Sequence, residues 1–249
     1  MLTFSLDQGA AHEAALGLIV LQSDESMEPE LRTLHLGDGV ALYHSRIPNA
    51  DDVTPDTLEA MSNALPDAAA LLPHRANLRA VAYGCTSGAT VIGPARVASL
   101  IRAHHPNAAC TDPMTAVIAA CRALNIRRLG LLTPYIESVS AAMRHYISEQ
   151  GIEIAAFASF EQKDDPTVAR ITEQSVLDAL GQFSGQAVDG VFTSCTNLRS
   201  FRIIDAAEQQ LGVPVLSSNL ALGWHLMTLA GLDPQGAGPG SLFATNSAQ

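Results

Sequence analysis

Apolar and polar positions alternate along the chain in blocks that predict an α/β fold. Apolar runs typical of strands buried in a parallel sheet occupy residues 15–21, 40–46, 80–83, 128–133, 152–160, 190–193 and 213–217. Segments with helical spacing or capping residues separate them, at 54–72, 86–101, 111–124, 136–150, 167–180, 201–211 and 218–229. Because strands and helices alternate, we expect mainly parallel sheets. The Gly-, Pro- and Ser-rich tail after Gly231 is expected to be loose.

The succession of predicted elements starts again near Ile126, and this repeat predicts two similar lobes. We assign residues 1–120 together with 218–249 to the first α/β lobe, and residues 121–217 to the second. A chain of 249 residues is long enough for one large domain or for two smaller ones, each with its own core.

Two of the predicted strands end at a cysteine in similar surroundings. Residues 80–90 read AVAYGCTSGAT and residues 190–200 read GVFTSCTNLRS, so Cys85 and Cys195 each follow a strand and precede a predicted helix. Ligands of open α/β folds bind at the carboxyl ends of the strands. The N–H groups at the start of a helix can hold a carboxylate, and the same positive end lowers the pKa of a thiol. We therefore expect a duplicated half-site with one reactive cysteine in each lobe.

Composition and charge narrow the class of protein. The chain is 47% hydrophobic and 16% charged, which excludes a disordered protein. It has no apolar run of the roughly 18 residues that a membrane span needs, and its first residues lack the features of a secretory signal. A net charge of −11 argues against nucleic acid or an acidic membrane as a partner. We expect a cytoplasmic globular protein with a small-molecule ligand.

The cysteines should be reduced thiols in that compartment. No Cys-x-x-Cys motif is present, so neither a thioredoxin-like site nor a zinc ribbon is predicted. Cys110 and Cys121 are expected to pack in the interior, and inert burial is also the alternative for the two strand-end cysteines. The pair His104-His105 matches no strong metal-site spacing, so we expect no metal.

Two thiols that face one another across a small acid can work as an acid–base pair. One removes a proton from the substrate or bonds to it, and the other donates a proton from the opposite side. Negative charge that develops on the substrate carboxylate can be stabilised by the N–H groups that follow each cysteine. Such a reaction needs no metal, flavin or pyridoxal cofactor.

These motifs resemble those of the aspartate/glutamate racemase superfamily, in particular the branch of maleate cis–trans isomerase, arylmalonate decarboxylase and ectoine utilisation protein A. The resemblance covers roughly residues 15–230 and depends on the order and spacing of short motifs. These motifs are Gly17-Leu-Ile-Val, Met27-Glu-Pro-Glu, Tyr83-Gly-Cys-Thr-Ser-Gly, Leu132-Thr-Pro-Tyr, Asp165-Pro-Thr-Val-Ala-Arg-Ile, Ser194-Cys-Thr-Asn-Leu-Arg and Ser218-Asn-Leu-Ala-Leu-Gly-Trp.

The resemblance implies an active site between two lobes that are related by a pseudo-two-fold axis. It also implies that Cys85 attacks or deprotonates the substrate and that Cys195 acts as the partner acid. Tyr135 matches the tyrosine that hydrogen-bonds a substrate carboxylate. The residues that match the oxyanion-binding segments are Thr86, Ser87, Thr196 and Asn197. The implied function is that of a cofactor-independent isomerase or racemase of a small carboxylate-bearing metabolite.

One position departs from the pattern of the maleate isomerases. Their loop after the first strand reads Ser-Ser-Asn-Thr-Thr and its Asn contacts the substrate, whereas residues 22–26 here read QSDES and place Asp24 there. A carboxylate that faces a dicarboxylate dianion repels it. As a substrate-binding residue, Asp24 favours a substrate with a cationic part, such as an amino acid or an amidinium like hydroxyectoine. The alternative is that Asp24 only caps the next helix.

Two other functions stay open at this point. One is an arylmalonate-type decarboxylase, but that branch has glycine at the position of Cys85, so Cys85 favours isomerase or racemase chemistry. The other is a non-catalytic ligand-binding protein of a catabolic pathway. Asp164 and Asp165 are expected to be solvated or to cap the helix that starts near Thr167. The resemblance allows a homo-oligomer, although no residue identifies its interface.

Overall fold

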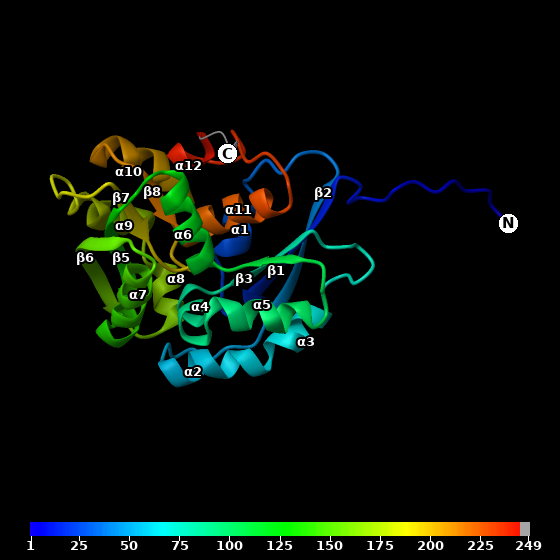
Figure 1. Cartoon of the computed structure of the whole chain (residues 1–249), viewed down its shortest axis with the longest axis horizontal. Coiled ribbons are helices and arrows are strands. Elements are labelled where there is room, and N and C mark those ends of the chain that lie inside the picture. The colour runs from blue at the N-terminus through cyan, green and yellow to red at the C-terminus, as the bar shows by residue number, and fades with distance from the viewer. Residues whose placement is uncertain (245–249) are drawn as a thin grey trace.

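The computed structural model describes residues 1–244 and has two lobes, each with a four-stranded parallel sheet covered by helices (Figure 1). The strands are β1 (Ala14–Leu21), β2 (Val40–Ile47), β3 (Ala80–Gly84), β4 (Ala109–Thr111), β5 (Arg128–Tyr135), β6 (Glu153–Gln162), β7 (Gly190–Thr193) and β8 (Val215–Ser217). They are arranged in the orders β2-β1-β3-β4 and β6-β5-β7-β8. The second order repeats the first, which confirms the predicted α/β fold with two pseudo-symmetric lobes.

Apart from α1 and α12, which lie outside the predicted segments, the helices agree with them except where a predicted helix is divided. They are α1 (Met27–Leu31), α2 (Pro55–Ala60), α3 (Leu65–Ala70), α4 (Thr86–Ile92), α5 (Pro94–Arg102), α6 (Pro113–Ala123), α7 (Glu137–Glu149), α8 (Asp165–Arg170), α9 (Glu173–Gly181), α10 (Ile204–Leu211), α11 (Ser218–Leu229) and α12 (Gly240–Ala244), with 3-10 helices η1 (Met61–Asn63) and η2 (Phe201–Ile203). The segment 86–101 is two helices because Gly93, at φ 86°, ends α4 and Pro94 then begins α5. Similar breaks divide 54–72 and 167–180. Strand β4 was not predicted.

The central strands place the two cysteines at equivalent positions. Strand β1 is buried along its whole length and pairs with β2 and β3, and β5 has the same central place in the second sheet. Strands β3 and β7 are each the third strand of their sheet. Cys85 follows β3 at once, and Cys195 lies two residues beyond the end of β7. The two cysteines therefore lie at the carboxyl ends of equivalent strands in the two sheets.

The C-terminal part of the chain connects the lobes. Helix α11 follows β8 of the second sheet directly and packs on β3 and α6. Helix α12 buries Leu242 and Phe243 and contacts α10, α11 and β8. The expectation of a loose tail after Gly231 is therefore wrong as far as Ala244, because these two apolar side chains anchor it; the tail's last residues lie outside the described part. The assignment of 1–120 with 218–249 and of 121–217 to the two lobes stays a prediction.

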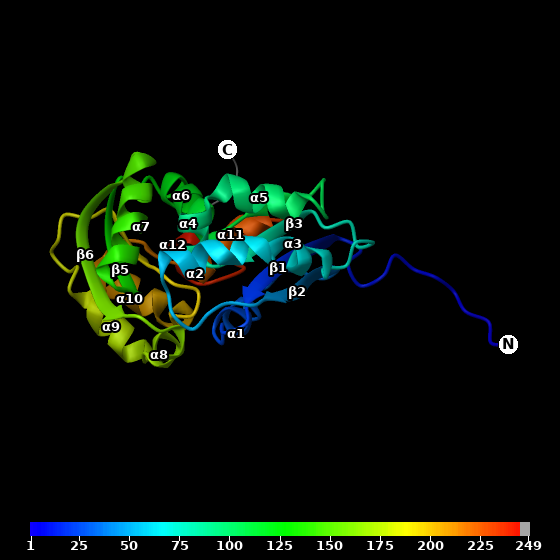
Figure 2. The same ribbon diagram turned by 90° about the horizontal axis from the view of Figure 1, so that it is seen from below.

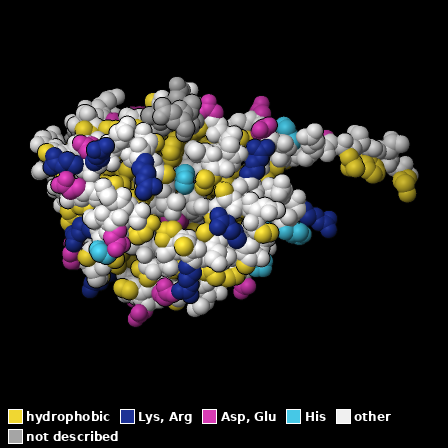
Figure 3. Space-filling model, in the orientation of Figure 1, with side chains coloured by type: hydrophobic (Ala, Val, Ile, Leu, Met, Phe, Trp, Pro, Cys, Tyr) yellow, Lys and Arg dark blue, Asp and Glu magenta, His cyan; other side chains and the backbone are white. Residues whose placement is uncertain are grey.

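The first residues extend away from the body of the protein, as the two ribbon views show (Figures 1 and 2). Their apolar side chains, among them Leu2, Phe4 and Leu6, are exposed. Acidic and basic side chains are interspersed over the face seen in Figure 3. Among residues 1–244, no helix is both long and apolar enough to cross a membrane.

Candidate active site

Cys85 ends β3 and is the N-cap of α4. Its backbone is extended, at φ −148° and ψ 117°, and its sulfur accepts a hydrogen bond from Gly88 N at 3.2 Å. The hydroxyl of Ser87 lies 3.7 Å from the same sulfur. A methyl group on Gly88 would lie 3.0 Å from this sulfur and 2.6 Å from the hydroxyl oxygen of Tyr83. Only glycine lets the N–H of this helical turn reach the thiol.

Cys195 lies in a different backbone setting. Its φ of 110° is a conformation that costs a non-glycine residue about 1–3 kcal/mol. Asn197 N donates to its sulfur at 3.3 Å, and Cys195 N donates to Ser218 Oγ at 3.0 Å. No helix starts at Cys195; the next elements are η2 and α10. The expectation of two equivalent strand-to-helix junctions is therefore correct for Cys85 only, because the residues after Cys195 make their hydrogen bonds to other parts of the fold.

A buried carboxyl group supports the loop that follows Cys195. Glu30 Oε1 accepts from Ser200 N at 2.7 Å and from Phe201 N at 2.9 Å. Asn219 Nδ2 donates to Glu30 Oε2 at 2.7 Å and to Thr196 O at 2.8 Å. The backbone on both sides of this loop is thus held by α1 and α11, which balances the strain at the cysteine.

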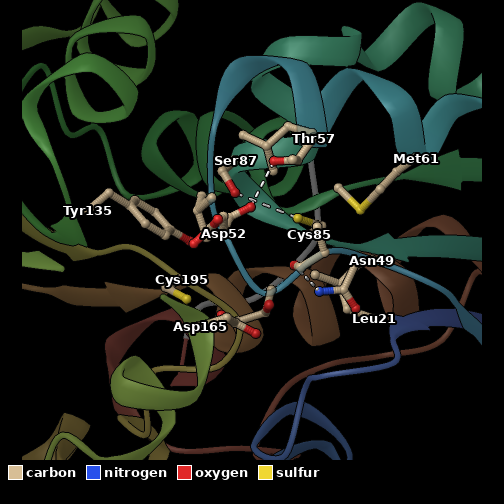
Figure 4. Close-up of a pocket in the computed structure, with 14 residues that line it drawn as sticks. Leu21, Asn49, Asp52, Thr57, Met61, Cys85, Ser87, Tyr135, Asp165 and Cys195 are labelled. Atoms are coloured by element: carbon tan, nitrogen blue, oxygen red, sulfur yellow. Dashed lines mark hydrogen bonds between the residues drawn. The ribbon is translucent and has the colours of Figure 1, made fainter. Parts of the chain in front are cut away.

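Both sulfurs line one pocket, to which the two lobes contribute (Figure 4). Its lining consists of Leu21, Asn49, Ala50, Asp52, Val53, Thr57, Leu58, Met61, Cys85, Ser87, Tyr135, Asp165, Cys195 and Thr196. About 390 Å³ of space between atoms, open solvent included, lies within this lining. The geometry on which the two-thiol interpretation depends, two cysteines at a single cavity, is therefore present.

A backbone contact between the lobes includes three lining residues of the pocket, Asp52, Val53 and Asp165. Val53 N donates to Lys163 O at 3.1 Å, and Asp165 N donates to Asp51 O at 3.3 Å. This contact is an isolated antiparallel bridge, in which Asp52 pairs with Asp164. The segment after β2 is in this way held against the start of α8, beside the cysteines.

Two of the predicted oxyanion residues and the predicted tyrosine line the pocket, whereas a third oxyanion residue, Thr86, does not. Ser87, Thr196 and Tyr135 line the pocket. Thr86 is outside its lining, and its hydroxyl donates to Ser218 Oγ at 2.8 Å, the same oxygen that accepts from Cys195 N. Ser218 at the start of α11 thus ties the two cysteine segments together.

The fourth predicted oxyanion residue, Asn197, supports neighbouring segments. It lies outside the pocket lining, where its Oδ1 accepts from Glu25 N at 2.8 Å. Its Nδ2 donates to Asp165 Oδ2 at 2.9 Å. The side chain therefore joins the loop after β1 to the start of α8.

Asp24 is placed as a helix cap. Its Oδ1 accepts from Ser26 N at 2.9 Å and from Met27 N at 2.8 Å, at the start of α1. The side chain is buried and is not part of the pocket lining. Burial raises the pKa of this carboxyl to about 6. Oδ1 thus makes capping bonds at α1, whereas Oδ2 is buried without a hydrogen-bond partner among the described residues, and substrate binding by Asp24 stays a prediction.

Asp165 is the functional candidate that sequence reasoning missed. It lines the pocket, and its Oδ2 accepts from Ser23 Oγ at 2.6 Å and from Asn197 Nδ2 at 2.9 Å. The capping role falls to Asp164, whose Oδ1 accepts from Thr167 N at 2.9 Å. The sequence Asp-Asp-Pro signals a helix start, but it does not say which of the two carboxyls points inward. Asn49 and Asp52, in the segment after β2, also line the pocket and were not predicted.

Burial dominates the electrostatics of both thiols. It raises the pKa of Cys85 to about 11 and raises the pKa of Cys195 well above its usual range. The negative charge of Asp165 acts in the same direction on both sulfurs, whereas the N–H groups of Gly88 and Asn197 oppose it. The expectation of a lowered thiol pKa is wrong for both cysteines, because removing a thiolate from water costs more than the hydrogen-bond donors around each sulfur recover.

The pocket combines two neutral thiols with hydroxyl groups that can donate hydrogen bonds. Burial raises the pKa of Tyr135 well above its ordinary value, so its hydroxyl stays a hydrogen-bond donor. At pH 7 only about one Cys85 side chain in ten thousand is ionised, so a reaction that needs the thiolate depends on what enters the pocket. Within the described part of the chain, His, Cys, Asp and Glu side chains form no group of three that could hold a metal ion.

Comparisons with known proteins show which proteins the chain is similar to. The chain is 27% identical to the maleate isomerase of Nocardia farcinica over 244 residues, which cover 94% of this chain and 96% of that protein. It is 32% identical to the arylmalonate decarboxylase of Bordetella bronchiseptica over 124 residues, 49% of this chain and 52% of that protein.

The fold is shared with solved structures of the same group. One is a cysteine-to-serine mutant of the Nocardia farcinica maleate cis–trans isomerase with a covalently bound succinylcysteine intermediate; it aligns with a TM-score of 0.83 at 24% identity over 94% of this chain and 99% of that one. The family model described as arylmalonate decarboxylase matches residues 16–243. The chain belongs to the arylmalonate decarboxylase family.

Proposed function

We propose that the protein is a cofactor-independent isomerase in which Cys85 and Cys195 act together on a small carboxylate-bearing molecule. The observation that carries this proposal is that both sulfurs line one small pocket together with the hydroxyl-bearing Tyr135. A relative named maleate isomerase that matches over nearly the full length of both chains supports it.

The two thiols have complementary roles in a cis–trans isomerisation. The Cys85 thiolate adds its electron pair to one carbon of the double bond, and the Cys195 S–H delivers its proton to the neighbouring carbon. The resulting carbon–carbon single bond rotates. The Cys195 thiolate then takes a proton back, the carbon–sulfur bond breaks, and the trans product leaves with Cys85 again as thiolate. For a racemase, one sulfur removes the α-proton and the other supplies a proton to the opposite face.

The surrounding side chains bind the carboxylate and hold the frame. The hydroxyls of Tyr135, Ser87 and Thr196 line the pocket and can donate to carboxylate oxygens. Thr86 and Asn197 act as positioning residues through Ser218 and Asp165. Asp24 acts through the cap of α1, next to the same loop.

The test is turnover by the purified chain and by single cysteine variants. Maleate, amino-acid enantiomers and a substituted malonate are incubated with the protein, and the products are followed by proton NMR. We expect isomerisation or racemisation, and a loss of about a hundredfold to ten-thousandfold in Cys85→Ser and in Cys195→Ser. Cys110→Ser, which alters a cysteine outside the pocket, should keep the activity. Equal activity in wild type and both serine variants would contradict the proposal.

A second candidate is decarboxylation of a malonate-type acid. The family description and the similarity to the Bordetella bronchiseptica decarboxylase favour it. Cys85 counts against it, since the resemblance to the decarboxylase branch predicts glycine at that position. Release of carbon dioxide from the substituted malonate, unaffected by Cys85→Gly, would select this candidate instead.

A further inference from the structure

Acidic side chains and no basic ones surround the space beside the two sulfurs. Asp52 and Asp165 belong to the pocket lining, which contains no Lys, Arg or His among residues 1–244. One carboxylate of a ligand can still be held by hydroxyl groups. A second anionic group would find no cation, and it would meet one of the two aspartates.

Asp165 is the better placed of these carboxylates. Its side chain is only 6% exposed, whereas Asp52 is exposed at the mouth. Both of its hydrogen bonds, from Ser23 and Asn197, go to Oδ2, which leaves Oδ1 without a hydrogen-bond donor among the described residues. Figure 4 shows the carboxyl group at the pocket wall beside Cys195. Oδ1 is therefore the oxygen of Asp165 that is left for a cationic group of a ligand.

The charge of Asp165 is strong enough to decide between ligands. Two unit charges about 5 Å apart in a site of effective dielectric constant about 20 change an affinity by about a hundredfold. A ligand that places a carboxylate near Asp165 therefore binds more weakly by this factor. A ligand that places a cationic nitrogen there binds more tightly, but by less than this factor, because the desolvation of the cation offsets part of the gain.

We propose that Asp165 determines the specificity of the pocket, and that the substrate is a small acid with a cationic nitrogen, an ammonium or an amidinium, close to its carboxylate. The inference rests on the proposed function and names the substrate class of that site. It moves to Asp165 the discrimination that the sequence alone suggested for Asp24, whose Oδ1 caps α1 and which lies outside the lining.

The same cation assists the chemistry. Burial is the main reason why the two thiols resist ionisation, and the negative charge of Asp165 adds to it at both Cys85 and Cys195. A cationic group beside Asp165 cancels that charge and makes the thiolate easier to form. A dianion in the pocket has the opposite effect. Binding and reactivity therefore favour the same class of acid.

The experiment measures binding without turnover. The Cys85→Ser chain is titrated calorimetrically with three acids on one cis-but-2-enoate skeleton: maleate with two negative charges, maleamate with one, and zwitterionic cis-4-aminobut-2-enoate. The zwitterion should bind about tenfold more tightly than maleamate and about a hundredfold more tightly than maleate. Adding Asp165→Asn should weaken the zwitterion about tenfold and strengthen maleate. Adding Asp164→Asn, the neighbouring carboxyl outside the lining, should leave the order unchanged, because Asn keeps the helix cap.

Several results overturn the inference. One is that the Cys85→Ser chain binds maleate as tightly as the zwitterion. Another is that it does not bind the zwitterion at all. The third is that Asp165→Asn changes the affinities for all three acids by the same factor. If the Asp165 variant fails to fold, the affinities of the Cys85→Ser chain alone still show whether the pocket prefers the zwitterion or the dianion. If the charge order holds while the intact chain turns over none of the acids, the isomerase proposal fails and the specificity of Asp165 stands.

Discussion

Replacing Glu30 by Gln should change how the stability of the protein depends on pH. Glu30 is buried in α1, and burial raises its pKa from the ordinary 4.5 to about 7. The hydrogen bonds from Ser200, Phe201 and Asn219 oppose this rise without cancelling it. The folded chain therefore keeps a proton on Glu30 at pH values where the unfolded chain has lost it.

The sign and size of the effect follow from this difference. Between about pH 4.5 and pH 7 the folded state binds more protons than the unfolded state, so the free energy of unfolding falls as the pH rises. The difference between the two pKa values corresponds to about 3 kcal/mol of stability, and most of it is lost between about pH 5 and pH 8. A Gln at this position cannot ionise and loses none of it.

The assay is urea unfolding at about pH 5 and pH 8 for the wild type and Glu30→Gln. From the lower to the higher pH, the free energy of unfolding of the variant relative to the wild type should rise by about 2–3 kcal/mol. Taking this difference removes the contribution of other groups, such as Asp24, whose pKa is raised to about 6 by burial. Glu13→Gln, an exposed carboxyl before β1, is the matched control and should show no such change. Parallel pH curves for the wild type and Glu30→Gln would refute the reasoning.

Two further predictions concern the thiol of Cys85. Gly88→Ala should lower the free energy of unfolding by about 1–3 kcal/mol and reduce kcat, because its methyl group would press on Cys85 and Tyr83; thermal unfolding and turnover check this. Gly181→Ala, whose methyl meets only the flexible end of Gln210, is the control, and equal losses in both variants would contradict the argument. Because the pKa of Cys85 is about 11, kcat/KM should rise about tenfold per pH unit between about pH 7 and pH 9, and a plateau from pH 7 would count against a thiolate formed from free enzyme.

Much of the fold could be predicted from the apolar pattern, because a strand buried in a parallel sheet needs a continuous apolar run. Strands β1, β3, β5 and β7 and the repeat after Ile126 agree with this pattern. Where prediction failed, the reason was local chain geometry. The positive φ of Gly93 divides a predicted helix, and the buried Leu242 and Phe243 anchor a tail that its Gly and Pro content made look loose.

The candidate site divides in a similar way. The sequence by itself determined that Cys85, Ser87, Tyr135, Cys195 and Thr196 stand where strands end, because the carboxyl ends of parallel strands meet at one edge. It also determined the class of chemistry, since a pair of thiols at two such edges can act from two sides of one acid.

Only the tertiary structure decided which carboxyl lines the pocket and in which direction the pKa values of the thiols are shifted. Asp24 caps a helix while Asp165 turns into the pocket, and its hydrogen-bond partners Ser23 and Asn197 come from segments far apart in the chain. The raised pKa of Cys85 is likewise a sum over neighbours from several elements that exclude water. Desolvation and electrostatic interactions depend on distances between atoms, and only the folded arrangement of the two lobes around the cavity sets these distances.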